Sequence, residues 1–82
     1  MNTYGIRDRK TNKFISIGLK EDKYLIVGVG SWKTTNVWSS LDDVQVVYEA
    51  LKDNFQDFEE QYFVDKLTEE EIEEMRQEWG WI

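Results

Sequence analysis

The sequence predicts a single α+β domain spanning residues 1–82, in which a small antiparallel sheet of about four strands packs against one amphipathic helix, with a second, acidic helix at the C-terminus. Three observations predict this class. Apolar and polar residues alternate over much of the N-terminal third, as they do in strands. One later segment repeats apolar residues at helical spacing. The last segment combines a helix-capping signal with a run of acidic residues.

Three N-terminal segments have strand character: residues 3–8, 13–19 and 24–30. The polar turn after the first segment ends in Asn12, a residue type that tolerates the positive φ that a hairpin turn requires. A further short strand is expected at 36–38. These segments predict the strands of an antiparallel sheet.

Alternation along the second and third segments also predicts which side chains face the core. Gly28 and Gly30, in the third segment, mark a bulge or a close backbone approach. Two matching apolar faces follow from the period of two. They consist of Ile15, Ile17 and Leu19 on the second segment, and of Leu25, Val27 and Val29 on the third.

The most regular helical pattern covers residues 41–54. Ser40 is a suitable N-cap because its hydroxyl accepts a hydrogen bond from a backbone N–H of the first turn. Asp42 and Asp43 lie in that turn, where the helix dipole favours negative charge. The apolar residues recur at intervals of three and four and form one stripe, made of Leu41, Val44, Val47, Tyr48, Leu51 and Phe55.

Residues 56–67 fit both a helix and a strand, and we favour a strand at 61–66 because this part is rich in aromatic and β-branched residues. Thr68 and Glu71 then form the S/T-x-x-E pattern of a capping box. A helix over 69–79 follows, with one apolar stripe of Ile72, Met75 and Trp79, and Gly80 is placed to end it.

The composition excludes several kinds of chemistry. The chain contains no Cys and no His, so it lacks the thiolate and imidazole ligands of structural zinc and haem sites, and also the usual serine and cysteine catalytic triads. Paired carboxylates occur, as at Asp42–Asp43 and Glu59–Glu60, but their neighbours predict no dry pocket that would raise a carboxylate pKa. We therefore expect a non-enzymatic protein with no metal and no other cofactor.

No run of 18 apolar residues is present, so the sequence predicts no membrane span and no membrane partner. Residues 1–13 lack the apolar core of a signal peptide. We therefore expect a cytoplasmic protein.

The charge is distributed unevenly along the chain. Residues 1–40 carry seven basic and three acidic side chains, a net of +4, and residues 41–82 carry three basic and fourteen acidic ones, a net of −11; together they give the formal charge of −7. The basic half, with aromatic residues between its cations, is compatible with single-strand binding. The negative total opposes approach to any polyanion, so we expect no direct contact with nucleic acid.

The acidic half is the stronger functional signal. Acids at i and i+4 of a helix lie about 5–6 Å apart, so an acidic helix can imitate the closely spaced phosphates of nucleic acid. Glu69–Glu73 and Glu70–Glu74 are such pairs, and their repulsion destabilises the helix. Trp81 follows Gly80 and is a candidate binding anchor. The predicted partner-binding residues are Asp57, Glu59, Glu60, Glu69, Glu70, Glu73, Glu74 and Trp81.

The opening segment, Tyr4-Gly5-Ile6-Arg7-Asp8-Arg9-Lys10-Thr11-Asn12-Lys13-Phe14-Ile15-Ser16, resembles the first hairpin of many small phage and prophage proteins. The later order of Trp38-Ser39-Ser40-Leu41-Asp42-Asp43, a helix, and then Tyr62-Phe63-Val64 is similar to theirs too. Small acidic chains of this kind resemble phage-encoded inhibitors of host defence of the anti-CRISPR type. The resemblance implies a CRISPR nuclease as partner, and the host cytoplasm as location.

We therefore predict a phage or mobile-element inhibitor that binds a basic nucleic-acid-binding groove on a host defence nuclease by acidic DNA mimicry. The alternative is a structural or assembly module that homodimerises through exposed aromatic residues, with Trp32, Trp38 and Trp81 as candidates.

Overall fold

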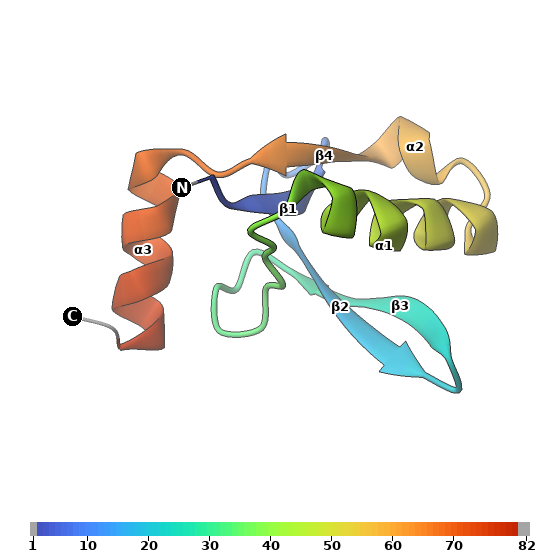
Figure 1. Cartoon of the computed structure of the whole chain (residues 1–82), viewed down its shortest axis with the longest axis horizontal. Helices are drawn as coiled ribbons and strands as arrows, with labels where there is room; N and C mark the ends of the chain where they lie inside the picture. The colour runs from blue at the N-terminus through green and yellow to red at the C-terminus, as the bar shows by residue number, and fades with distance from the viewer. Residues whose placement is uncertain (1, 81–82) are drawn as a thin grey trace.

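A computed structural model describes residues 2–80 of the chain. Trp81, one of the predicted partner-binding residues, lies outside the described residues. Figure 1 shows an α+β arrangement of β-ribbons and helices, which is the fold class that the sequence predicts. The elements are β1 (Tyr4–Asp8), β2 (Ile15–Lys20), β3 (Lys23–Val29), α1 (Leu41–Asn54), α2 (Phe58–Gln61), β4 (Tyr62–Lys66) and α3 (Glu69–Trp79).

The four strands form two antiparallel pairs, β1 with β4 and β2 with β3, instead of one four-stranded sheet. The free edge of β1 is shared by two isolated bridges, Arg7 to Phe14 at one end and Tyr4 to Trp38 at the other. Because Trp38 occupies the edge at Tyr4, β2 cannot continue along β1. The backbone N–H of Ile17 in β2 instead donates to the side-chain oxygen of Asn36 at 2.7 Å. The strand expected at 36–38 is thus reduced to the Trp38 bridge.

A bulge in the β2–β3 ribbon corrects the predicted face of β3. The pairing passes from Ser16–Gly28 to Ile17–Ile26, so Val27 has no cross-strand partner. The extra residue reverses the side-chain alternation on its far side. Ile26 therefore packs against the core with Ile17, while Val27 is 64% exposed. The bulge lies next to Gly28, where the sequence indicates one.

The main core lies where α1 covers the strands. Val44 and Leu51 on α1 are fully buried, and Tyr48 and Phe55 pack at its margin; Leu41 is exposed, although the predicted stripe includes it. Ser40 caps α1 by accepting from the Asp43 N–H at 3.4 Å. The buried cluster consists of Ile6, Ile15, Val44, Val47, Leu51 and Phe58.

The ambiguous segment after α1 contains both a helix and a strand. Asp57, in the left-handed conformation with φ of 59°, precedes the single turn of α2, and β4 follows directly within the range that the sequence favours for a strand. The Tyr48 hydroxyl donates to the carbonyl of Tyr62 at 2.9 Å and so ties α1 to the start of β4. The Phe58 ring packs between Tyr48 and Tyr62.

The bounds of α3 are those that the sequence predicts. The Thr68 hydroxyl accepts from the Glu71 N–H at 3.1 Å, and the Glu71 carboxylate accepts from the Thr68 N–H at 3.0 Å, which completes the capping box. Gly80 ends the helix with φ of 75°. A second small core forms where Met75 of α3 meets Phe14 and Leu67.

Within residues 2–80, no helix is long and apolar enough to cross a membrane.

Replacement of Leu51 by Ala tests the main core. The side chain is fully buried, and its loss leaves a cavity, so the free energy of unfolding should fall by about 2–5 kcal/mol in urea denaturation. Val46→Ala on the same helix is the control, because Val46 is 68% exposed; its effect should be within about 0.5 kcal/mol. Equal losses in both variants would contradict this account of the core.

Candidate functional site

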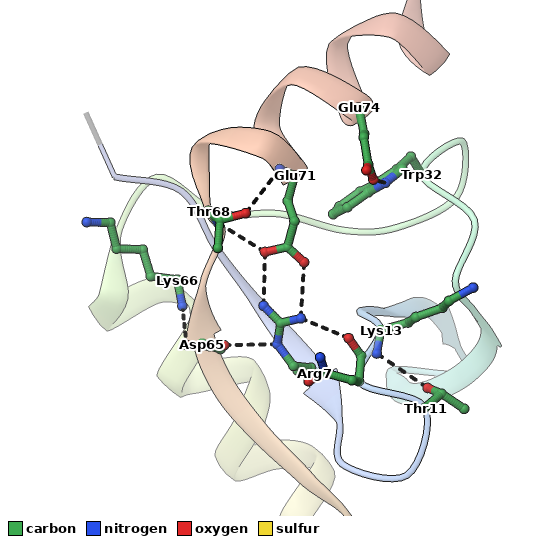
Figure 2. A network of polar contacts seen from close by, with 10 residues as sticks. Arg7, Thr11, Lys13, Trp32, Asp65, Lys66, Thr68, Glu71 and Glu74 are labelled. Carbon is green, nitrogen blue, oxygen red and sulfur yellow. Dashed lines mark hydrogen bonds and ion pairs between the residues drawn. The ribbon is translucent and has the colours of Figure 1, made fainter.

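The acidic helix α3 is joined to the strands by one buried cation, Arg7. Arg7 is 6% exposed and lies near the end of β1 (Figure 2). Its Nη1 and Nη2 donate to the two carboxylate oxygens of Glu71, each at 3.0 Å, and Nε donates to Asp65 at 2.9 Å. Nη1 also donates to the carbonyl of Asn12 at 2.8 Å, and the guanidinium carbon lies 4.1 Å from the centre of the Phe14 ring.

The groups around Arg7 outweigh the cost of burying its charge. Burial alone would lower the pKa of Arg7, but the hydrogen bonds and charges of Glu71 and Asp65 raise it. For Glu71, burial would raise the pKa, and the hydrogen bonds from Arg7 and from the Thr68 N–H lower it. Both partners are therefore held in their charged forms, in the bidentate geometry that suits Arg and carboxylate.

Asp8 shapes the turn that supplies the carbonyl of Asn12. Its carboxylate accepts from the Thr11 hydroxyl at 2.8 Å and from the Lys10 N–H at 3.3 Å. Burial would raise the pKa of Asp8, but these hydrogen bonds lower it. Asn12 has φ of 60°, as expected for the end of this turn. The turn therefore presents a backbone oxygen, and not a third carboxylate, to Arg7.

Besides Glu71, α3 carries five further carboxylates. Glu69, Glu70, Glu73, Glu74 and Glu78 are all exposed. In the part of the chain that the structure describes, the ion pairs of α3 involve Glu71, and none of these five takes part in one. Those that are three or four positions apart are neighbours on the helix surface and repel one another. The structure thus brings together the four predicted site residues of α3.

The predicted site residues around α2 lie elsewhere. Asp57, Glu59 and Glu60 are exposed at the far end of β4 from α3 (Figure 1). The five residues of β4 separate the two groups by about 17 Å of extended chain. Glu59 lies 3.4 Å from the ammonium of Lys52, so its charge is partly offset. The acids predicted as one surface therefore form two groups, of which the α3 group is the less neutralised.

The loop between β3 and α1 faces α3 and carries Trp32. Thr35 is buried and donates to the Ser31 carbonyl at 2.6 Å, and the Thr34 and Ser16 hydroxyls are 2.7 Å apart. These contacts fix the loop against β2. Trp32 projects from this loop toward α3 (Figure 2).

Two indole groups close the gap between this loop and α3. Trp32 Nε1 donates to a carboxylate oxygen of Glu74 at 3.3 Å, as Figure 2 shows. Trp79 Nε1, near the end of the helix, donates to the Trp32 carbonyl. The Trp32 ring also packs on Phe14, with 5.7 Å between the ring centres. The C-terminal half of α3 is thus joined to the body of the protein at its own contacts, separate from Arg7.

A pocket of about 240 Å³ lies between the loop and α3. One wall is aromatic and the other is the line of Glu71, Glu74 and Glu78 on the helix. A second hollow, lined by Trp32, Glu74, Gln77 and Glu78, adjoins the same indole. The first pocket is lined by Asn12, Lys13, Phe14, Gly30, Trp32, Thr35, Glu71, Glu74 and Glu78.

The sequence reasoning missed Arg7 and Trp32 as parts of this site. Glu71 was identified as a capping residue, but its second role, as the partner of Arg7, depends on a contact between residues 64 positions apart. The one feature of the sequence that could have indicated this contact is a single Arg within a strand of alternating apolar and polar residues. Among residues 2–80, no group of three or more carboxylates converges closely enough to hold a metal ion.

The effect of pH tests the Arg7–Glu71 contact. Because folding lowers the pKa of Glu71, its stabilising contribution is fully present above the ordinary value of 4.5 and is lost as the pH falls through the lower folded pKa. Glu71→Gln should lower the free energy of unfolding by about 1–3 kcal/mol at pH 7 and flatten its decline below pH 4.5. The measurement is denaturant unfolding at several pH values.

Glu70→Gln is the matched control, since Glu70 is exposed on the same turn of α3. It should not lower the stability at pH 7, because the exposed Glu70 has no ion pair to lose, and it should keep the decline in acid. A Glu71→Gln variant with the same pH dependence as the intact chain would contradict the role given to this carboxylate.

Comparison of the chain with protein-family models, with curated proteins and with solved structures finds no match.

Proposed function

We propose that this chain is a non-enzymatic inhibitor that binds a basic nucleic-acid-binding groove of a host defence nuclease, with a CRISPR effector as the favoured partner. The acidic face of α3 is the binding surface and acts as a mimic of DNA. One observation carries the proposal: five exposed carboxylates lie on a single docked helix, and within the described residues none of them has a cationic partner.

The charge density of α3 supports mimicry of a nucleic-acid strand. Glu69 and Glu78 are nine residues apart, which corresponds to about 14 Å of helix axis. Five carboxylates less the cation of Arg76 give about one net charge per 3.5 Å of this length. One strand of DNA carries a charge about every 3.4 Å. A groove lined with Lys and Arg would therefore meet a similar field on α3.

The way α3 is held also favours binding. A rigid charged surface loses less conformational freedom on association than a mobile tail does. The N-terminal turn of α3 is fixed by the capping box and Arg7, and Trp79 joins the other end to the loop. The carboxylates are thus already arranged along a helix before a partner arrives.

The acids of α3 contrast with those of α1. On α1, Glu49 lies 3.9 Å from the ammonium of Lys52, which also faces Glu59. Such mixed charges are typical of a solvated helix face. On α3 none of the five exposed carboxylates takes part in an ion pair within the described residues, so the helix bears a repulsive cost that a purely solubilising surface does not require.

The acids near α2 would form a second contact for the same partner. They lie at the other end of β4, so a groove that meets both groups would have to follow the long dimension of the molecule, which extends 38 Å. The resemblance of the opening hairpin to phage proteins is what directs the proposal to a host defence nuclease. The α3 face alone supports the broader class of basic grooves.

The alternative, a homodimer formed through exposed aromatic residues, is less favoured. Trp38 packs against the main core and pairs with Tyr4, and Trp32 packs between Phe14 and α3. Neither ring is freely exposed. Within residues 2–80, the large exposed apolar side chains are aliphatic; they lie on the β2–β3 ribbon, as Leu19 and Val27 do, and on α1, as Val46 does. Trp81, the third candidate, lies outside the described residues.

Charge reversal on α3 tests the proposal. We expect the intact chain to displace labelled target DNA from a guide-loaded CRISPR nuclease in a fluorescence anisotropy assay, with an affinity that falls as salt rises. The double variant Glu70→Lys/Glu73→Lys should lose about tenfold or more in affinity, because both carboxylates face outward on α3.

The control is Glu49→Lys/Asp53→Lys, which changes the net charge equally but on α1. It should retain most of the affinity. An affinity that does not change with salt concentration, or an equal loss of affinity in the two double variants, would contradict a specific role for α3. Circular dichroism checks that both variants keep their helices.

A further inference from the structure

The pocket between Trp32 and α3 points to a more specific ligand. We propose that it binds a guanidinium group, in the form of an arginine side chain of the partner protein. The inference deepens the proposed function and rests on it for the source of the arginine. The affinity of the pocket for guanidinium follows from its own geometry and is tested separately.

The molecule already holds one guanidinium next to this pocket. Arg7 lies over the Phe14 ring at 4.1 Å, and the carboxylate of Glu71 accepts two hydrogen bonds from its edge. An aromatic face below and a carboxylate at the edge satisfy both the planar cation and its fixed N–H donors. This pair shows which arrangement accommodates a guanidinium in this fold.

The same arrangement recurs along α3 toward its C-terminus. Glu74 and Glu78 follow Glu71 at intervals of three and four, so they line the same side of the helix. Trp32 takes the place of Phe14 as the aromatic partner. Its indole N–H donates to one oxygen of Glu74 and so orients that carboxylate, while the other oxygen remains available to a ligand.

No arginine of the described chain lines this second position. Arg7 is committed to Glu71, and Arg9 lies over Phe63 at 4.5 Å. Arg76, on α3 itself, does not line the pocket. A guanidinium held between Trp32 and the two carboxylates would therefore have to come from outside the residues described here.

Guanidinium fits the pocket better than other cations do. Its donors point in several directions in one plane and can meet Glu74 and Glu78 together, whose side chains originate about 5–6 Å apart on the helix. An ammonium is a compact point charge and gains less from a flat indole and two separated acceptors. At about 240 Å³, the pocket is below the usual range for drug-sized ligands and suits a single side chain.

Lys13 shows whether the ligand of the pocket is a cation or an anion. It lines the pocket on the side opposite α3, and its stem lies against Gly30. Its positive charge opposes an incoming cation. If the ligand is a guanidinium, removal of this charge should strengthen binding; if the ligand is an anion, removal should weaken it.

The experiment is a titration of the full ¹⁵N-labelled chain with Nα-acetyl-arginine N-methylamide at low salt, followed by NMR. We expect saturable shifts of the Trp32 indole N–H and of the Glu74 and Glu78 amides. The citrulline analogue has nearly the same shape without the charge and should give no saturation. The lysine analogue should bind about threefold or more weakly. Binding of citrulline equal to that of arginine would overturn the proposal.

Three variants locate the site. Glu78→Gln should weaken arginine binding about threefold or more, and Lys13→Gln should strengthen it about twofold or more. The control is Glu69→Gln, which removes a carboxylate from α3 outside the pocket lining and should leave the affinity near that of the intact chain. Unchanged affinity in Glu78→Gln, or weaker binding in Lys13→Gln, would overturn the assignment.

The two proposals fail in different ways. If the chain binds arginine saturably but binds no basic groove, the proposed function is refuted and the assignment of the pocket as a guanidinium site stands. Displacement of DNA from the nuclease that is lost in Glu70→Lys/Glu73→Lys, together with no arginine binding, would support the acidic face and refute the pocket. Neither of those residues lines the pocket, so the double variant separates the two sites.

Discussion

The burial of one guanidinium is the constraint on which the rest of the structure depends. Arg7 of β1 lies where the turn before β2, β4 and α3 meet, and each of these three segments contributes a partner to it. A buried charge left without partners costs several kcal/mol. If these segments separated, the guanidinium would either be exposed to water or remain buried without partners. In a chain with a small core, such a contact fixes the position of a helix that buries few side chains of its own.

This anchor explains how a strongly acidic helix is tolerated. Met75 is the one residue of α3 that is buried in the core. The exposed faces of the helix carry carboxylates that repel one another. Propensity would hardly maintain so short a helix in water. The capping box and Arg7 hold its first turn, and Trp79 holds its last. Stability and charge are therefore divided between different faces of the same helix, and the charged face is available for a partner.

The sequence predicted the local features of the fold and missed those that depend on contacts across it. The bounds of α3, its capping box and the Ser40 cap follow from short-range patterns. The division of the strands into two ribbons could not be predicted, because it depends on Trp38 competing with β2 for the edge of β1. The bulge at Val27 likewise reversed a face that alternation predicts. Within the site, the exposed acids were foreseeable from composition, whereas Arg7 and the pocket at Trp32 depend on which residues lie beside α3.

The central claim is that α3 is a preformed acidic helix held in place by Arg7, and native-state hydrogen exchange tests it most directly. In the intact chain we predict that the amides of residues 75–77 in α3 are protected well beyond unfolded rates. In Arg7→Met their protection should fall about tenfold or more, while the amides of α1 keep most of theirs. Unfolded-like exchange of α3 in the intact chain, or unchanged protection of α3 in Arg7→Met, would contradict the account.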